Sequence, residues 1–212
     1  MKAKSFLAIL AMFVLFAFVF SSCPSPSGGV GNVGGIVDDN DDGDGVIDGG
    51  GGGTSSFILT SSAFTHNQRL ADKYCYAGVS GGDNISLPFS WTGAPEDTLS
   101  FALVIYDPDG GDFVHWAVFN IPADCDSIAE GASGSAYMPE NCVELSNNFG
   151  SPGYGGPQPP PGTGTHRYIA SLYALNTANI PGLSGNKNHN EIMNILSGNI
   201  IVTASITGTY SR

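Results

Sequence analysis

Two apolar runs, 101–106 and 113–119, lie on either side of a short polar loop. Both are rich in β-branched and aromatic residues and carry almost no charge, which favours buried strands. Further runs of this kind are found at 57–59, 87–91, 166–175 and 200–210. The sequence therefore predicts a core built from strands.

One segment, 189–196, has a helical pattern, with Glu191 near its start and Ile192, Ile195 and Leu196 on one face. Turn-forming residues separate the other runs throughout. Many strands joined by long Gly/Pro loops, with one or two short helices, predict a mostly β fold. We expect a two-sheet antiparallel β sandwich rather than alternating βαβ units.

Residues 1–23 have the pattern of a secretory signal peptide, with two lysines before the apolar run 6–20 and two serines after it. The run is short for a bilayer crossing, which takes about 20 apolar residues. The residues up to Cys23 resemble a bacterial lipobox, although Phe20 replaces the usual aliphatic residue. We expect lipidation of Cys23 and anchoring at the bacterial cell envelope, facing out of the cytoplasm. The alternative is ordinary cleavage and a secreted, soluble protein.

Residues 24–56 are mainly Gly, Ser, Pro, Asn and Asp, with too few apolar groups to repay the entropy of folding. We predict a flexible tether. Its side chains at Asn40, Asp42, Asp44 and Asp48 have part of the spacing of a calcium loop, but glycines follow where such a loop has its glutamate. Calcium binding and a solvated acidic spacer both remain open.

The remaining residues, 57–212, suffice for one domain. They contain 13 acidic and 5 basic side chains, a net charge of −8, and no basic run. This charge argues against a nucleic-acid partner.

Three cysteines fall in this domain. An exported protein can oxidise them, and we favour a disulfide between Cys125 and Cys142, with Cys75 left over. The alternative is three buried thiols that pack as small hydrophobic groups.

Polar residues gather where the predicted strands begin and end. Asp107 and Asp109 follow one strand, His115 opens the next, and a Gly/Pro-rich loop at 153–162 leads into His166. We expect these groups to meet at one rim of the sandwich.

At these residues the chain resembles the phosphatidylethanolamine-binding proteins, in particular their bacterial Raf-kinase-inhibitor-like branch. The resemblance covers most of the domain, because several dispersed motifs occur in the family's order. They are Gly82 to Ser86, Tyr106 to Asp109, His115 to Pro122, the Gly/Pro loop with His166 to Tyr168, Leu172 to Leu175, and Gly208 to Tyr210. It implies a β sandwich with a shallow pocket for phosphate-like anions, including phospholipid head groups.

The resemblance also implies a role for each matching residue: Asp107 as the pocket carboxylate, His115 and His166 facing the anion, Tyr168 as a hydroxyl donor, and Gly155, Gly156 and Pro157 as the backbone of the mouth. A carboxylate repels an anion, so we expect Asp107 to orient His115 or hold its proton, raising the pKa of that imidazole. Arg167 should point to the other sheet surface and have a structural role.

These features favour an envelope-anchored binding module for a small anionic or phosphorylated group, or for a protein docked at the same rim. We expect no catalytic activity and no cofactor. One alternative is a protein inhibitor of an envelope peptidase or of a kinase-like partner. Another is a metal-dependent hydrolase in which Asp107, His115 and His166 bind the ion.

Overall fold

The computed structural model describes residues 56–212. The predicted signal peptide with Cys23, the tether up to residue 55 and the calcium-loop residues from Asn40 to Asp48 lie outside the described residues. Within 56–212, no helix has both the length and the apolar character needed to cross a membrane.

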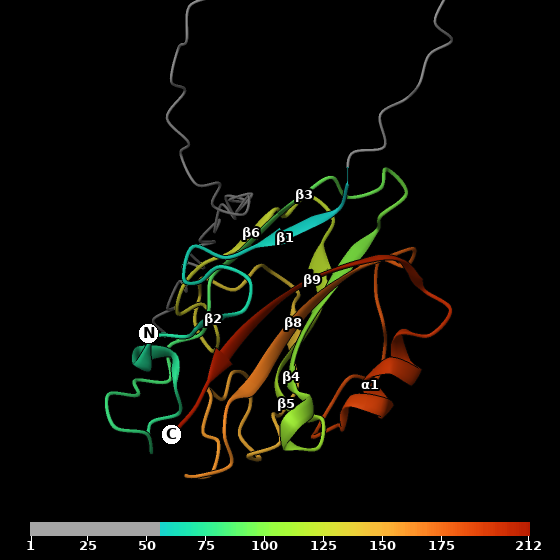
Figure 1. Cartoon of the computed structure of the whole chain (residues 1–212). Helices are drawn as coiled ribbons and strands as arrows, with labels where there is room; N and C mark the ends of the chain where they lie inside the picture. Colours follow the sequence, from blue (N-terminus) through green and yellow to red (C-terminus); the bar gives the residue numbers. More distant parts are fainter. Residues whose placement is uncertain (1–55) are drawn as a thin grey trace, which may run out of the picture.

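The described chain folds into two β-sheets (Figure 1). The smaller sheet has the order β1 (Ile58–Thr60), β3 (Phe89–Thr92), β6 (Ser127–Ile128). The larger has the order β2 (Gln68–Arg69), β9 (Ile200–Tyr210), β8 (His166–Leu175), β4 (Ser100–Asp107), β5 (Phe113–Pro122), β7 (Val143–Glu144). Neighbouring strands are antiparallel except β2 and β9, which are parallel. The predicted mostly β, two-sheet fold is confirmed.

The predicted helix is also present, as α1 (His189–Leu196). It begins with a capping box, in which the Asn188 side chain accepts from the Glu191 amide at 3.0 Å and the Glu191 carboxylate accepts from the Asn188 amide at 2.8 Å. Two short 3-10 helices, η1 (Asp72–Tyr74) and η2 (Pro108–Gly110), complete the described elements.

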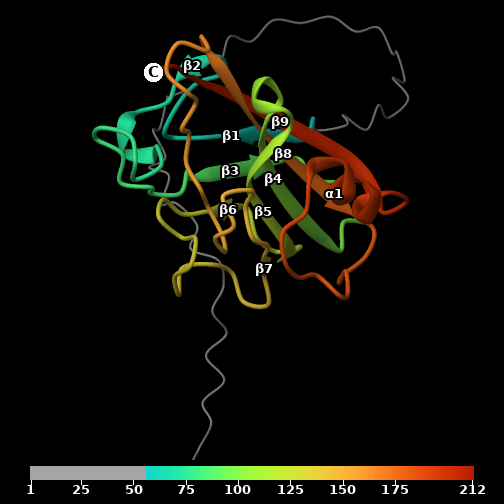
Figure 2. The same cartoon turned by 90° about the horizontal axis from the view of Figure 1, so that it is seen from below.

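The central strand β4 is buried on both faces. Phe101, Leu103 and Ile105 pack into the core between the two sheets. Ala102 and Val104 point the other way, into a second core that contains Ile192 and Leu196 of α1. Figure 2 shows α1 on the opposite side of the large sheet from β1 and β3. This double burial explains the continuous apolar run in the sequence.

A β-bulge in the β4–β5 pairing determines where His115 points. Ile105 pairs with Trp116 and the next residue, Tyr106, pairs with Val114, so His115 is the extra residue on β5. Both His115 and Trp116 therefore face the side of the large sheet that packs on the smaller one, where His115 contacts Tyr168 and Trp116 lies in the core.

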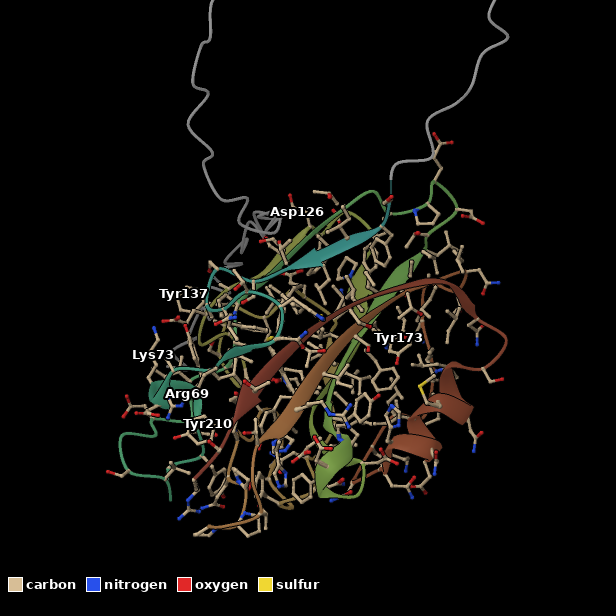
Figure 3. The ribbon with its side chains drawn as sticks, viewed as in Figure 1. Arg69, Lys73, Asp126, Tyr137, Tyr173 and Tyr210 are labelled. Carbon is tan, nitrogen blue, oxygen red and sulfur yellow. The ribbon has the colours of Figure 1, made fainter. Side chains whose placement is uncertain are left out.

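Polar contacts hold the segment around η1 to the end of β9. The Arg69 guanidinium lies 4.5 Å from the centre of the Tyr210 ring, and the Tyr210 hydroxyl donates to Asp72 at 2.8 Å. Arg69 also pairs with Asp72 at 2.6 Å. Figure 3 shows Arg69 and Tyr210 together at this edge of the domain.

The predicted disulfide between Cys125 and Cys142 is wrong, because the Cys142 thiol is free. Cys125 leads into β6, which pairs with β3 in the small sheet, whereas Cys142 leads into β7, which pairs with β5 in the large sheet. The two residues are near in sequence but belong to segments on different layers. Burial raises the pKa of the Cys142 thiol to about 12.

The packing of α1 can be tested with two isoleucines of the same helix. Ile192 is fully buried, whereas Ile195 is only partly buried. We expect Ile192→Ala to lower the free energy of unfolding by about 2–4 kcal/mol and Ile195→Ala to lower it by less than half as much. Urea denaturation measures both; equal losses would contradict the described orientation of the helix.

Candidate ligand-binding site

A cavity of about 500 Å³ opens at one end of the large sheet. The end of β4, the start of β5 and the start of β8 meet there, next to η2 (Figure 1). Its lining consists of Asp107, Asp109, Gly110, Phe113, His115, Phe149, Gln158, Pro159, Pro160, Thr163, Thr165, His166 and Tyr168. The structure thus brings together four of the predicted site residues, Asp107, His115, His166 and Tyr168.

Asp107 holds two parts of the cavity wall in place. One carboxylate oxygen accepts from the Gly110 amide at 2.9 Å and so caps η2. The other lies 2.7 Å from Nδ1 of His166. Asp107 and His166 are only 4% and 5% exposed, so this pair is formed away from bulk water.

The expectation that Asp107 orients His115 is wrong, and the pKa of His115 is lowered overall although Asp107 acts to raise it. Asp107 lies opposite Phe113 in the strand pairing and is bonded to His166 on the other neighbouring strand. His115 instead places Nδ1 2.6 Å from the Gly155 carbonyl oxygen. Burial lowers the pKa of His115 to about 4, and the Gly155 carbonyl and Asp107 offset only part of this effect.

The contact with Gly155 decides which nitrogen of His115 carries the proton. A carbonyl oxygen can only accept, so Nδ1 is the donor. At neutral pH, Nε2 is then left as an acceptor on a residue that lines the cavity. His115 in this state cannot donate to an anion's oxygen.

Tyr168 follows His166 by two positions on β8, so both side chains lie on the same face of the sheet. Its hydroxyl is buried and has no hydrogen-bond partner within residues 56–212. Burial raises the pKa of Tyr168 well above its ordinary value, so the hydroxyl keeps its proton. It is a donor without a protein acceptor.

The three residues expected at the mouth, Gly155, Gly156 and Pro157, lie behind the lining. The Gly155 amide donates to the His115 carbonyl oxygen at 2.8 Å, and its carbonyl oxygen lies 2.6 Å from Nδ1 of His115. The Pro157 carbonyl accepts from the Tyr76 amide at 3.1 Å. Gly156 runs against the backbone of Tyr74. The lining is supplied instead by the next residues in the loop, Gln158, Pro159 and Pro160. The physical reason is that this glycine segment packs against the chain around η1.

Asp109, which the sequence analysis placed at the rim without a specific role, also lines the cavity. Arg167 donates to it from Nε at 2.9 Å and from a terminal nitrogen at 2.8 Å, and this pairing lowers the pKa of Asp109 to about 2. Arg167 does not line the cavity, in agreement with its predicted structural role. Within the described residues, the lining therefore contains no lysine or arginine.

Other lining residues gave little signal in the sequence. The Phe113 and Phe149 rings meet edge to face with centroids 4.7 Å apart, but Phe149 lies in an Asn/Gly-rich loop without periodicity. Thr163 could have been found from its position three residues before His166 in a glycine-rich turn.

In the described part of the chain, no three His, Cys, Asp or Glu side chains are grouped closely enough to hold a metal ion. The hydrolase alternative required such a group at Asp107, His115 and His166. Within the described residues, these three side chains do not form such a group.

Comparison with known proteins identifies the family. The family model for phosphatidylethanolamine-binding proteins matches residues 60–211. The chain belongs to the phosphatidylethanolamine-binding protein family. The resemblance noted in the sequence is thereby confirmed.

Relatives of this family in other organisms are similar over the whole domain. A UPF0098 protein of Methanothermobacter thermautotrophicus is 35% identical over 156 residues, which cover 73% of this chain and 98% of the relative. The crystal structure of Escherichia coli YbcL, described as a new member of the mammalian PEBP family, has a TM-score of 0.70 at 34% identity and covers 74% of this chain and 99% of that chain. The homologue CT736 of Chlamydia trachomatis has a TM-score of 0.62 at 30% identity, covering 74% and 98%.

The buried His115 should make stability depend on pH. Its folded-state pKa of about 4 is below the ordinary 6.5, so the unfolded chain takes up a proton first as the pH falls. We expect the free energy of unfolding to be highest above pH 6.5 and to drop by roughly 3 kcal/mol between pH 6.5 and 4 through this residue. Urea denaturation at a series of pH values measures the slope.

Two variants separate His115 from other titrating groups. In His115→Asn the amide can still donate to Gly155 but takes up no proton, so the slope should flatten. The exposed His66 provides the control, and His66→Asn should keep the wild-type slope. An unchanged slope in His115→Asn would show that the burial of His115 does not cause the effect.

The packing of Gly156 leads to a further expectation. A Cβ there would overlap the carbonyl oxygen of Tyr74, whereas a Cβ at Gly162 would meet nothing within 4 Å, although φ is +84°. We expect Gly156→Ala to lower the free energy of unfolding by more than about 2 kcal/mol, and Gly162→Ala by about 1 kcal/mol, from the positive φ alone. The reverse order in thermal or urea denaturation would refute this assignment.

Proposed function

We propose that this protein is an envelope-anchored binding module that holds a small phosphate-like group, free or as part of a phosphorylated or phospholipid head group, in the cavity at the end of β4, β5 and β8. The anchoring part of the proposal depends on lipidation of Cys23. The observation that chiefly supports the binding part is the Tyr168 hydroxyl, a buried donor without a protein partner in the described chain that belongs to the cavity lining.

The charges at the cavity favour recognition through neutral donors. The Asp109 carboxylate forms an ion pair with Arg167, and the Asp107 carboxylate accepts a hydrogen bond from His166. The ion pair with Arg167 reduces the repulsion of an anion by Asp109. Neutral donors at the cavity include the side chains of Tyr168, Gln158 and Thr165.

The tautomer of His115 indicates which protonation state of a phosphate group should bind. Its Nε2 is an acceptor at neutral pH, so it binds an oxygen that still carries a proton, as the monoanion of a phosphate does. The second pKa of a phosphate ester is about 6. The monoanion of a phosphate monoester should therefore bind better than its dianion, and affinity should fall as the pH rises through this range.

The proposal can be tested by titrating the purified protein with inorganic phosphate, phosphoethanolamine and phosphotyrosine at pH 5.5 and 7.5, with the histidine resonances followed by NMR. We expect saturable shifts of His115 and His166, with tighter binding at pH 5.5. The double variant His115→Ala/His166→Ala should lose binding. If that variant bound the ligands with wild-type affinity, the assignment of the binding site to His115 and His166 would be refuted.

Two tyrosines with buried hydroxyls make a matched pair for the same titration. Tyr168→Phe removes the unpartnered donor, so affinity should fall about tenfold while the free protein becomes no less stable. Tyr154 donates to the Tyr74 carbonyl at 2.9 Å, so Tyr154→Phe should cost about 1 kcal/mol of stability and leave affinity unchanged. Unchanged affinity in Tyr168→Phe would exclude its hydroxyl as a ligand donor.

A further inference from the structure

Three residues of the cavity lining form a chain of hydroxyl, imidazole and carboxylate. Oγ1 of Thr163 lies 2.9 Å from Nε2 of His166, and Nδ1 of His166 lies 2.7 Å from Oδ2 of Asp107. These are the separations at which a base can take the proton of a nucleophile while a carboxylate orients that base. Nothing in the binding function requires the hydroxyl of Thr163 to be placed there.

The hydrogen bonds of His166 determine which of its two ring nitrogens carries the proton. A carboxylate can only accept, so Nδ1 carries the proton and Nε2 of the neutral ring is the acceptor. The Thr163 hydroxyl also lies 2.8 Å from the Pro160 carbonyl oxygen. That oxygen already accepts from the Thr163 amide at 3.3 Å, so the hydroxyl can turn to His166 without leaving it unpartnered.

The three residues differ in solvent exposure, as a nucleophile with a buried base and carboxylate would. Thr163 is exposed and can meet a ligand, whereas His166 and Asp107 are buried at 5% and 4% exposure. Burial strengthens the pairing of the imidazole with the carboxylate and fixes the ring orientation. Thr163 is held near His166 by a local turn, because the two residues are only three positions apart.

The next two residues provide possible donors for an oxyanion. The backbone amides of Gly164 and Thr165 follow the hydroxyl directly and make no backbone hydrogen bond within the described chain. Gly164 has φ of +89°, a conformation that lets the backbone turn at this point. Amides next to a nucleophile can stabilise the negative oxygen of a tetrahedral intermediate.

We propose that Thr163, His166 and Asp107 give this protein a hydrolytic activity toward small carboxylic esters. Oγ1 of Thr163 attacks the ester carbonyl carbon while its proton passes to Nε2 of His166, and the carbonyl π electrons move to the oxygen. The intermediate collapses, the bond to the alcohol breaks, and His166 returns the proton to the departing alkoxide. Water then attacks the acyl-threonine with His166 as base, releasing the carboxylic acid and restoring the hydroxyl.

This activity is separate from anion binding, since neither requires the other. Phosphate in the cavity should act as a competitive inhibitor if both proposals hold. Hydrolysis without phosphate binding would overturn the binding proposal alone, and binding without hydrolysis would overturn this one alone.

The test is hydrolysis of p-nitrophenyl acetate by the purified full-length protein, followed by absorbance. This ester has a good leaving group, so even a weak nucleophile with a base should give a measurable rate. We expect Thr163→Val to lower kcat/KM by about 100-fold, in the range of general-base catalysis, and Thr163→Ser to retain activity. Thr203→Val, at an exposed threonine of β9 outside the cavity lining, should change the rate less than about twofold.

A fluorophosphonate probe gives a second readout that does not depend on turnover. We expect one adduct per chain, located by mass spectrometry on the peptide containing Thr163 and absent from Thr163→Val. Equal rates in wild type and Thr163→Val would assign hydrolysis to another group and overturn the proposal. Absence of both hydrolysis above buffer and an adduct in the wild-type protein would also overturn it.

Discussion

The burial of β4 on both faces is the constraint on which the domain depends. Its side chains alternate between the core shared by the two sheets and the core under α1, so a single strand joins both layers of packing. Hydrogen bonds to β5 and β8 hold it between two long neighbours. Because Asp107 is the last residue of this fixed strand, the carboxylate at the cavity has little freedom, and the groups bonded to it are positioned from the core outward.

The partners of the acidic groups then limit what the cavity can do. Asp109 forms an ion pair with Arg167 and Asp107 accepts a hydrogen bond from His166, in a domain with a net charge of −8. The described lining is left with hydroxyl, amide and imidazole groups beside the aromatic rings of Phe113 and Phe149. Under the proposed function, such a surface would recognise a ligand by hydrogen bonds and shape rather than by a strong electrostatic field.

The same pair of buried residues takes part in both proposals. The carboxylate of Asp107 orients His166, and an oriented imidazole can either contact a bound group or serve as a base for Thr163. Membership of the phosphatidylethanolamine-binding protein family accounts for the two-sheet sandwich. In this chain the side chain next to Nε2 of His166 is that of Thr163.

Much of the fold could be predicted from the sequence because strand and helix patterns are local. The runs at 101–106, 113–119, 166–175 and 200–210 correspond closely to β4, β5, β8 and β9, and the segment 189–196 is α1. The short strands β2, β6 and β7 were not predicted, since two residues carry no periodicity. The family motifs also led to Asp107, His115, His166 and Tyr168 as one group.

By itself, the sequence determined the strand-rich core, the helix and the set of polar residues at the strand ends. Only the tertiary structure decided their partners. The arrangement of the strands side by side determines the bulge that turns His115 inward, the bond of Asp107 to His166 and the close packing of Gly156. It also leaves the Cys142 thiol free. Strand order and register arise from packing between residues far apart in the chain, and no local pattern records those contacts.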